Sequence, residues 1–289
     1  MISQALVANG AKVYITGRRA EVLESTVKEY NTGPGSLHAL PGDVSTKAGA
    51  IQLAKDLGEK ESNGIQLLVN NAGIARDTNT SFCKLHTINP PSSALTLTPS
   101  AAANGQPDMS DPEAISKHFL QSEDDQFMET FKTNVTGQYF MSMAFLPHLA
   151  KGRDVTPGYT SSVVNVSSIS GSMKGSSNGQ FAYASSKAAF THLSRMLATT
   201  FKDTKVRVNI IAPGIFPSEM TTGKSDEKNK SELSSKIGNP AGRGGHDSDM
   251  AASILFLAGP GGLFYNEQTL YPDGGKLMSL SPVNKWQFG

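Results

Sequence analysis

The chain has 289 residues, a formal net charge of +1 and a single cysteine, Cys83. This length is enough to bury one large α/β core, and the near-neutral charge excludes a general attraction to nucleic acid or to anionic membranes. One cysteine excludes an internal disulfide framework and is typical of a reducing compartment. No apolar run approaches the roughly 18 residues of a membrane-spanning helix, and the first residues lack a signal peptide's pattern. We therefore expect a cytoplasmic protein without membrane or nucleic-acid partners.

The amino-terminal residues follow a helical pattern. Ile2, Ala5 and Leu6 have the spacing of one helix face, and Gly10 suits the carboxyl end of a helix. Residues 12–16 then read as a strand. In dinucleotide-binding α/β folds, a strand and a Gly-rich loop come before the first helix, and this turn holds the pyrophosphate. We expect that strand and loop to be absent from this chain, which would leave two neighbouring strand edges unpaired.

Short β-branched runs alternate with longer amphipathic stretches along the chain. The predicted strands are 12–16, 36–40, 65–69, 162–166, 206–211 and 268–271. The predicted helices are 20–30, 46–61, 123–149, 181–201 and 247–257. Alternation of strands and helices implies right-handed crossovers and a mostly parallel sheet. The predicted fold class is therefore α/β: a single domain, residues 1–289, with a Rossmann-like doubly wound parallel sheet and helices on both faces.

Residues 78–112 interrupt this alternation. They are rich in Ser, Thr, Pro, Asn and Ala, they include Pro90-Pro91 and Asn104-Gly105, and they carry no period. Structureless loops of this length are uncommon in compact domains. We expect an irregular insertion here, and three interpretations stay open: a disordered segment, a lid, or non-native sequence from a faulty gene model.

Tyr183 and Lys187 are four residues apart in a predicted helix and so share one of its faces. An ammonium close to a phenol favours the phenolate and lowers a reference pKa of about 10. Ser168 and Ser170 follow the predicted strand 162–166, and folds of this kind bind ligands at the carboxyl ends of their strands. The pattern predicts a proton donor or acceptor that works near neutral pH.

Further motifs occur in a fixed order along the chain. They are Thr16-Gly-Arg-Arg19, Gly42-Asp-Val44, Asn70-Asn-Ala-Gly73, Asn134-Val-Thr-Gly137, Val164-Asn-Val-Ser-Ser168, Tyr183-x-x-x-Lys187, Pro213-Gly214 and Pro272-Asp-Gly-Gly275. With these motifs the chain resembles the short-chain dehydrogenase/reductase family in its classical form. The resemblance extends over nearly the whole chain, apart from residues 78–112 and the carboxyl-terminal end.

The resemblance implies hydride transfer between a nicotinamide cofactor and a small-molecule carbonyl or alcohol. Tyr183 would be the general acid or base, and Lys187 would lower the Tyr183 pKa and hold the nicotinamide ribose. Ser168 would orient and polarise the substrate carbonyl. Asn134 would lie on a helix and anchor a water in the proton relay toward Lys187.

The choice of serine has one alternative. The family pattern selects Ser168, but its separation from Tyr183 is about two residues longer than usual, and Ser170 would restore the spacing. We favour Ser168 because it is anchored at the strand end, while residues 176–180 resemble a loop that can absorb extra residues.

The predicted cofactor is NADP(H) rather than NAD(H). Enzymes that use NAD commonly carry an acidic residue after the second strand of the fold, whereas this chain has Gly17, Arg18 and Arg19 there. A guanidinium can bind a 2′-phosphate bidentately, so Arg18 is the first candidate. The alternative is that both arginines are solvated residues that open the next helix. The family pattern adds further cofactor-binding residues: Asp43, Val44, Asn70, Asn71, Gly73, Tyr183, Lys187, Pro213, Gly214, Phe216 and Ser218.

The leading hypothesis is an NADP(H)-dependent carbonyl reductase or alcohol dehydrogenase, specifically a 3-oxoacyl-type ketoreductase. The competing hypothesis is a catalytically silent or misannotated, truncated chain that cannot bind the cofactor, because it lacks the Gly-rich loop. The resemblance also implies a homo-oligomer, a dimer or a tetramer, formed through the helices that carry Asn134 and Tyr183. The six histidines lack ligand spacing, so no metal site is predicted. The substrate and the direction of the reaction stay open.

Overall fold

The computed structural model describes residues 1–82, 105–223, 225–233 and 238–279. Most of the insertion predicted at 78–112, together with Cys83, lies outside these residues. At the start of that insertion, residues 78–80 form a turn and Phe82 contacts the loop before a later helix.

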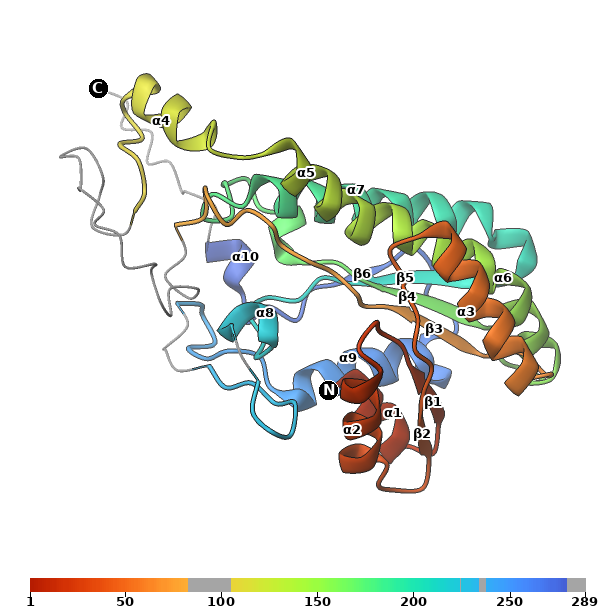
Figure 1. Cartoon of the computed structure of the whole chain (residues 1–289). Helices are drawn as coiled ribbons and strands as arrows, with labels where there is room; N and C mark the ends of the chain where they lie inside the picture. Colours follow the sequence, from red (N-terminus) through yellow and green to blue (C-terminus); the bar gives the residue numbers. More distant parts are fainter. Residues whose placement is uncertain (83–104, 224, 234–237, 280–289) are drawn as a thin grey trace.

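The described strands lie where the sequence predicts them, with shifts of one or two residues at their ends. They are β1 (Lys12–Ile15), β2 (Ser36–Ala39), β3 (Leu67–Asn70), β4 (Ser162–Val166), β5 (Arg207–Ile211) and β6 (Thr269–Leu270). All of them pair in parallel, and Figure 1 shows helices between successive strands. The predicted α/β class with a Rossmann-like parallel arrangement is confirmed.

Every predicted helix is present, but one of them is divided, and three further helices are not predicted. They are α1 (Ile2–Ala8), α2 (Ala20–Tyr30), α3 (Lys47–Lys60), α4 (Pro112–Phe119), α5 (Asp124–Phe131), α6 (Gln138–Asp154), α7 (Phe181–Thr200), α8 (Glu219–Thr222), α9 (Asp247–Ala258) and α10 (Lys276–Ser279). The helix predicted at 123–149 is divided by a π-helical turn, η2 (Lys132–Gly137). Helices α4, α8 and α10 are not predicted. For α4 the sequence holds start signals, because Asp111 caps the helix and Pro112 opens it.

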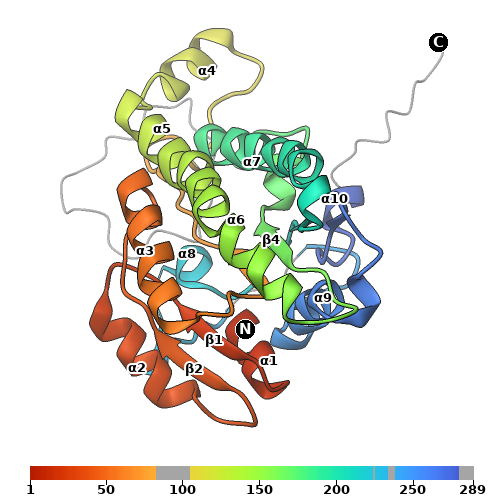
Figure 2. The ribbon, with the colours of Figure 1, turned by 90° about the vertical axis from the view of Figure 1, so that its right-hand side faces the viewer.

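Helices cover both faces of the strands (Figure 2). Strands β4 and β5 are buried along their whole length, as is typical of a parallel sheet between two helical layers. On one face α3, α6 and α7 bury a cluster that includes Leu53, Leu149 and Phe201. On the other face α1 and α9 bury a second cluster that includes Ile211 and Ile254. None of the helices in the described part of the chain is long and apolar enough to cross a membrane.

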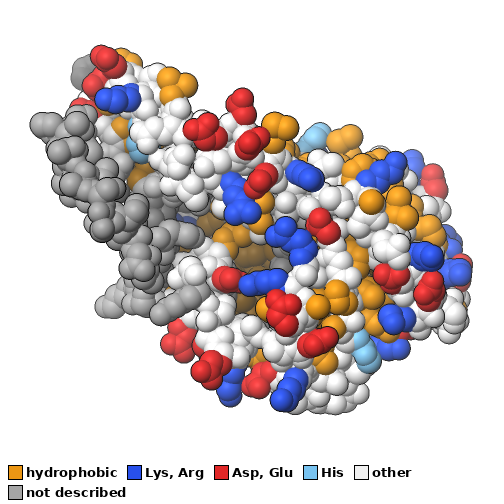
Figure 3. All heavy atoms as spheres, in the orientation of Figure 1, with side chains coloured by type: hydrophobic (Ala, Val, Ile, Leu, Met, Phe, Trp, Pro, Cys, Tyr) orange, Lys and Arg blue, Asp and Glu red, His pale blue; other side chains and the backbone are white. Residues whose placement is uncertain are grey.

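Loops follow the carboxyl ends of β1, β3, β4 and β5. The face shown in Figure 3 is hollowed, and Lys, Arg, Asp and Glu side chains surround the hollow. Because parallel strands end at one edge of a sheet, loops from distant parts of the sequence meet there.

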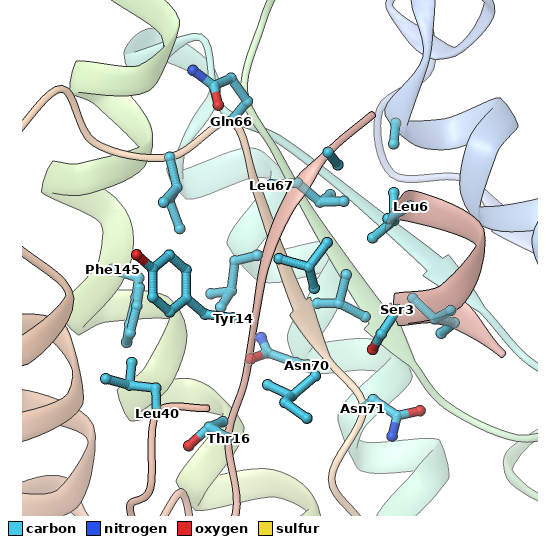
Figure 4. A pocket seen from close by; sticks show the side chains of 18 of the residues that line it. Ser3, Leu6, Tyr14, Thr16, Leu40, Gln66, Leu67, Asn70, Asn71 and Phe145 are labelled. Carbon is cyan, nitrogen blue, oxygen red and sulfur yellow. The ribbon is translucent and has the colours of Figure 1, made fainter. Parts of the chain in front are cut away.

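The strands form two sheets rather than one. Their orders are β1-β2 and β3-β4-β5-β6, and a cavity of about 920 Å³ separates β1 from β3. Figure 4 shows Leu6 on one side of this gap and Tyr14, Leu40 and Phe145 on the other. Among the described strands, β1 pairs only with β2 and β3 only with β4. Two strand edges therefore face each other across the gap, as the sequence predicts.

Candidate active site

Helix α7 places Tyr183 and Lys187 side by side, one turn apart. The Lys187 Nζ lies 5.8 Å from the centre of the Tyr183 ring and donates a hydrogen bond to the Val166 carbonyl oxygen at 2.9 Å. Only 3% of Lys187 is exposed, and it makes no ion pair with any residue that the structure describes. Burial lowers the pKa of Lys187 to about 8.

The surroundings of Tyr183 correct one expectation. Burial raises the pKa of the Tyr183 phenol, and a hydrogen bond with the Ser168 side chain offsets only part of this effect. The sequence predicts that Lys187 lowers this pKa, but in the structure desolvation outweighs any such effect. The phenol is therefore held protonated at neutral pH, which is the form that can donate a proton.

The structure separates the two candidate serines. Ser168 directly follows Ser167 at the end of β4, and its hydroxyl accepts from the Ser170 amide at 3.1 Å and bonds with Tyr183. The Ser170 hydroxyl instead accepts from the Ser177 hydroxyl at 2.9 Å. Ser168 is thus the serine beside Tyr183.

Asn134 lies in the π-helical turn η2 and is fully buried. Its side-chain amide donates to the Ile74 carbonyl oxygen at 2.8 Å and to the Ser186 hydroxyl at 2.9 Å, and its oxygen accepts from the Ile74 amide at 2.8 Å. Both N–H donors are therefore used on protein partners. The Asn134 side chain thus links the segment after β3 to helix α7. A water could bind only to the remaining lone pair of the Asn134 side-chain oxygen.

A cavity of about 660 Å³ brings most of the predicted site residues together. Those that line it are Arg18, Asp43, Val44, Asn71, Gly73, Ser168, Tyr183, Lys187, Pro213, Gly214, Phe216 and Ser218. Asn134 lies behind this wall. Asn70 is not among these residues: its amide donates to Ser142 and Asn165, both at 2.9 Å, which joins β3 to α6 and β4. Asn70 lines the adjoining cavity of about 920 Å³ instead.

One end of the cavity is strongly charged. The Asp43 carboxylate accepts from the Ser45 side chain and amide, and these bonds, with the cations Arg18 and Lys132, lower the Asp43 pKa. Arg18 makes no ion pair within the described part of the chain, whereas Arg19 pairs with Glu219 at 3.2 Å.

Sequence reasoning does not identify Lys132, which lines the cavity beside Asp43. It stands two residues before Asn134, so the start of that motif is the signal that could have found it. The described residues contain no group of three or more His, Cys, Asp and Glu side chains placed to hold a metal ion.

Comparisons with known proteins agree with this geometry. Residues 1–90 match the family model described as short chain dehydrogenase, and residues 107–276 match the model described as enoyl-(acyl carrier protein) reductase. The chain is 36% identical over 284 residues to short-chain dehydrogenase/reductase PhomF of Diaporthe leptostromiformis, an alignment that covers 98% of this chain and 88% of the relative.

Two further comparisons concern Pseudomonas aeruginosa. The chain is 31% identical over 275 residues to that organism's rhamnolipids biosynthesis 3-oxoacyl-(acyl-carrier-protein) reductase, covering 95% of this chain and 90% of the relative. It superposes with a TM-score of 0.70 on the solved structure of the Pseudomonas aeruginosa RhlG/NADP active-site complex, at 29% identity and with 95% and 90% coverage of the two chains. The chain is therefore a member of the short-chain dehydrogenase/reductase family of oxidoreductases.

Proposed function

We propose that the protein is an NADP(H)-dependent ketoreductase that reduces the carbonyl of a 3-oxoacyl-type substrate. The observation that carries this proposal is the cavity of about 660 Å³ with Ser168, Tyr183 and Lys187 in one wall and Arg18 at its charged end. The relatives described as 3-oxoacyl-(acyl-carrier-protein) reductases support the substrate class.

The residues of the cavity suit a nicotinamide dinucleotide at both of its ends. A side chain at Gly73 would bring its Cβ within 3.1 Å of the Lys187 Nζ and 3.3 Å of the Asn134 Oδ1, so glycine leaves room for a ribose beside the ammonium. At the other end, Arg18 makes no ion pair within the described residues and can donate two hydrogen bonds to a 2′-phosphate. The structural similarity to the RhlG/NADP complex supports NADP(H) as the cofactor.

The proposed chemistry follows from three side chains. A substrate carbonyl oxygen placed between the hydroxyls of Ser168 and Tyr183 would accept a hydrogen bond from each, which stabilises the negative charge that develops there. The reduced nicotinamide, when bound, supplies the hydride to the carbonyl carbon. Tyr183 donates its proton to the oxygen, and the nearby Lys187 ammonium stabilises the phenolate that remains.

The test is reduction of acetoacetyl-coenzyme A, a 3-oxoacyl thioester, with NADPH consumption and formation of the 3-hydroxyacyl product measured together. We expect turnover by the wild type and a loss of about a hundredfold or more in Tyr183→Phe, which lacks the proton donor. Tyr139→Phe is the matched control, because Tyr139 is 38% exposed on α6 and lies outside the cavity lining. Equal turnover by wild type and Tyr183→Phe would refute the proposed mechanism.

A second candidate function is a catalytically silent chain that does not hold the cofactor by itself. The gap of about 920 Å³ between β1 and β3 favours this candidate. Arg18 follows a strand of the β1-β2 sheet and Tyr183 follows a strand of the other sheet, and no described strand pairs with both sheets. Exposed strand edges of this kind readily accept a further strand. Absence of saturable NADPH binding to the chain would favour this candidate over the first.

We also infer a homo-oligomer, a dimer or a tetramer, formed through α5, α6 and α7. Met128 on α5 and Met196 on α7 are 67% and 56% exposed, and Phe181 on α7 is 47% exposed. Exposed apolar side chains on packed helices are typical of an interface, and family resemblance implies the same helices. A monomeric mass in analytical ultracentrifugation would contradict this inference.

A further inference from the structure

Helix α7 begins at Phe181 without a capping side chain of its own, since Gln180 at the N-cap position makes no side-chain cap bond. The first N–H groups of a helix have no partners inside it. Asp77, which is far away in the sequence, is the acceptor for two of these N–H groups. One of its carboxylate oxygens accepts from the Ala182 amide at 2.7 Å and the other from the Tyr183 amide at 3.0 Å. The cap of this helix thus comes from the segment that follows β3.

Asp77 is only 4% exposed, and its carboxylate makes no ion pair within the described residues. Burial raises its pKa, and the bonds from the Ala182 and Tyr183 amides offset part of this shift. Leaving an unpaired charge in the interior is costly. The positive end of the α7 dipole compensates part of the cost, so the carboxylate holds the amino end of α7 more strongly than a neutral cap would.

The same segment is anchored on both sides of Asp77. On one side, Ile74 exchanges two hydrogen bonds with Asn134, each of 2.8 Å. On the other side, the Thr80 hydroxyl donates to the Gly179 carbonyl oxygen at 2.9 Å, and the Phe82 amide donates to the Asn178 carbonyl oxygen at 3.0 Å. Residues 74–82 therefore form a strap that joins η2 to the loop before α7.

We propose that Asp77 is a positioning residue for the reaction: by binding the backbone of Tyr183 it holds the phenol against Ser168 and beside Lys187. This inference rests on the proposed function for its kinetic consequence. Its structural basis, the cap on α7, stands without that function. A displacement of about 1 Å at a reacting group can cost on the order of a hundredfold in rate, so a change in this cap should affect turnover more than binding.

The experiment compares Asp77→Asn with Asp111→Asn in the full chain. Asp111 also caps a helix, accepting from the Glu113 amide at 2.9 Å, but α4 carries none of the proposed site residues. We expect Asp77→Asn to lower kcat for acetoacetyl-coenzyme A by about tenfold or more, with KM and the NADPH dissociation constant within about twofold of wild type. Asp111→Asn should leave all three values within about twofold.

Hydrogen exchange supplies a second readout that needs no turnover. The amides of Ala182 and Tyr183 should exchange faster in Asp77→Asn, while those in the middle of α7 keep their wild-type rates. If Asp77→Asn does not fold, Asp77→Glu keeps the charge, displaces it by one methylene, and should show the same kcat loss.

Each outcome has one meaning. A wild-type kcat in Asp77→Asn, with an active wild type, would overturn the positioning role, as would equal losses of kcat, NADPH affinity and thermal stability. An inactive wild type would refute the proposed function alone. In that case unchanged exchange at Ala182 and Tyr183 would overturn the cap, and faster exchange would support it.

Discussion

Lys187 occupies a position that costs the protein stability. Its burial lowers its pKa to about 8 from an ordinary value of 10.5, so the folded state disfavours the charge that the unfolded state carries. Between these two values the unfolded chain binds more protons, and the free energy of unfolding rises with pH. Burial raises the pKa of Tyr183, so above about pH 10 the folded state keeps the phenol proton that the unfolded state loses. There the Tyr183 contribution makes the free energy of unfolding fall with pH. The buried charge of Lys187 therefore destabilises the folded state, and we expect that it serves the reaction.

We therefore predict that Lys187→Met stabilises the protein while abolishing its activity. At pH 7 its free energy of unfolding should exceed that of wild type by on the order of 1 kcal/mol, and the rise between pH 8 and 10 should disappear. Chemical denaturation at pH 7 and pH 9.5 measures both effects. Lys55→Met, at an exposed position on α3, is the control and should keep the wild-type pH dependence. A destabilised Lys187→Met with wild-type turnover would contradict the account.

At this scale the sequence identifies most of the site, because Tyr183, Lys187 and Ser168 are fixed by short spacings on one helix and one strand end. It does not identify Asp77, whose two partners lie 105 and 106 residues later. It also does not show that the Asn70 amide bonds to Ser142 and Asn165, because a motif does not reveal which way a side chain at the end of β3 points.

Among the elements, the π-helical turn η2 connects the charged end of the cavity, through Lys132, to helix α7, through Asn134. Gly137 packs against the loop after β2: a Cβ there would lie 2.3 Å from the Val44 carbonyl oxygen. The contact is with backbone, so a larger residue cannot be accommodated by a side-chain rotation. Val44 itself lines the cavity, which makes this close approach part of the site's architecture.

Gly137→Ala should destabilise the protein by about 1 to 3 kcal/mol and weaken NADPH binding, because the Val44 loop must move. Alanine is otherwise the better helix former, so any loss of stability in this variant results from the clash with Val44. Gly175→Ala is the matched control, since nothing lies within 4 Å of its Cβ position. Thermal unfolding and NADPH titration of both variants measure the effect. Equal behaviour of the two variants would show that the Val44 contact is unimportant.

The elements themselves are only partly readable from the sequence. The period of apolar residues continues through 123–149, so it predicts one helix where the structure has α5, η2 and α6. Thr133, Asn134 and Gly137 are poor helix formers and were the available sign of an interruption. Strand positions were predictable because most are short apolar or β-branched runs, but pairing depends on contacts between distant segments.

On the scale of the whole molecule, the described strands form two sheets that the proposed cofactor must bridge. The charged end of the cavity follows β1 and β2, and the catalytic end follows β4 and β5. NADPH would contact Arg18 on one side and Tyr183 and Lys187 on the other. Binding would therefore join the two halves across the gap between β1 and β3, and the affinity for NADPH reports whether this chain achieves that.

The most direct measurement is a fluorescence titration of the chain with NADPH and with NADH, in wild type, Arg18→Ala and Arg19→Ala. Arg19 is the control, because it pairs with Glu219 and is not part of the cavity that Arg18 lines. We predict saturable binding that favours NADPH in wild type and Arg19→Ala, and an NADPH affinity lower by about tenfold or more in Arg18→Ala, with NADH little changed. No saturable binding by the wild type, or an equal NADPH affinity in Arg18→Ala, would contradict the account.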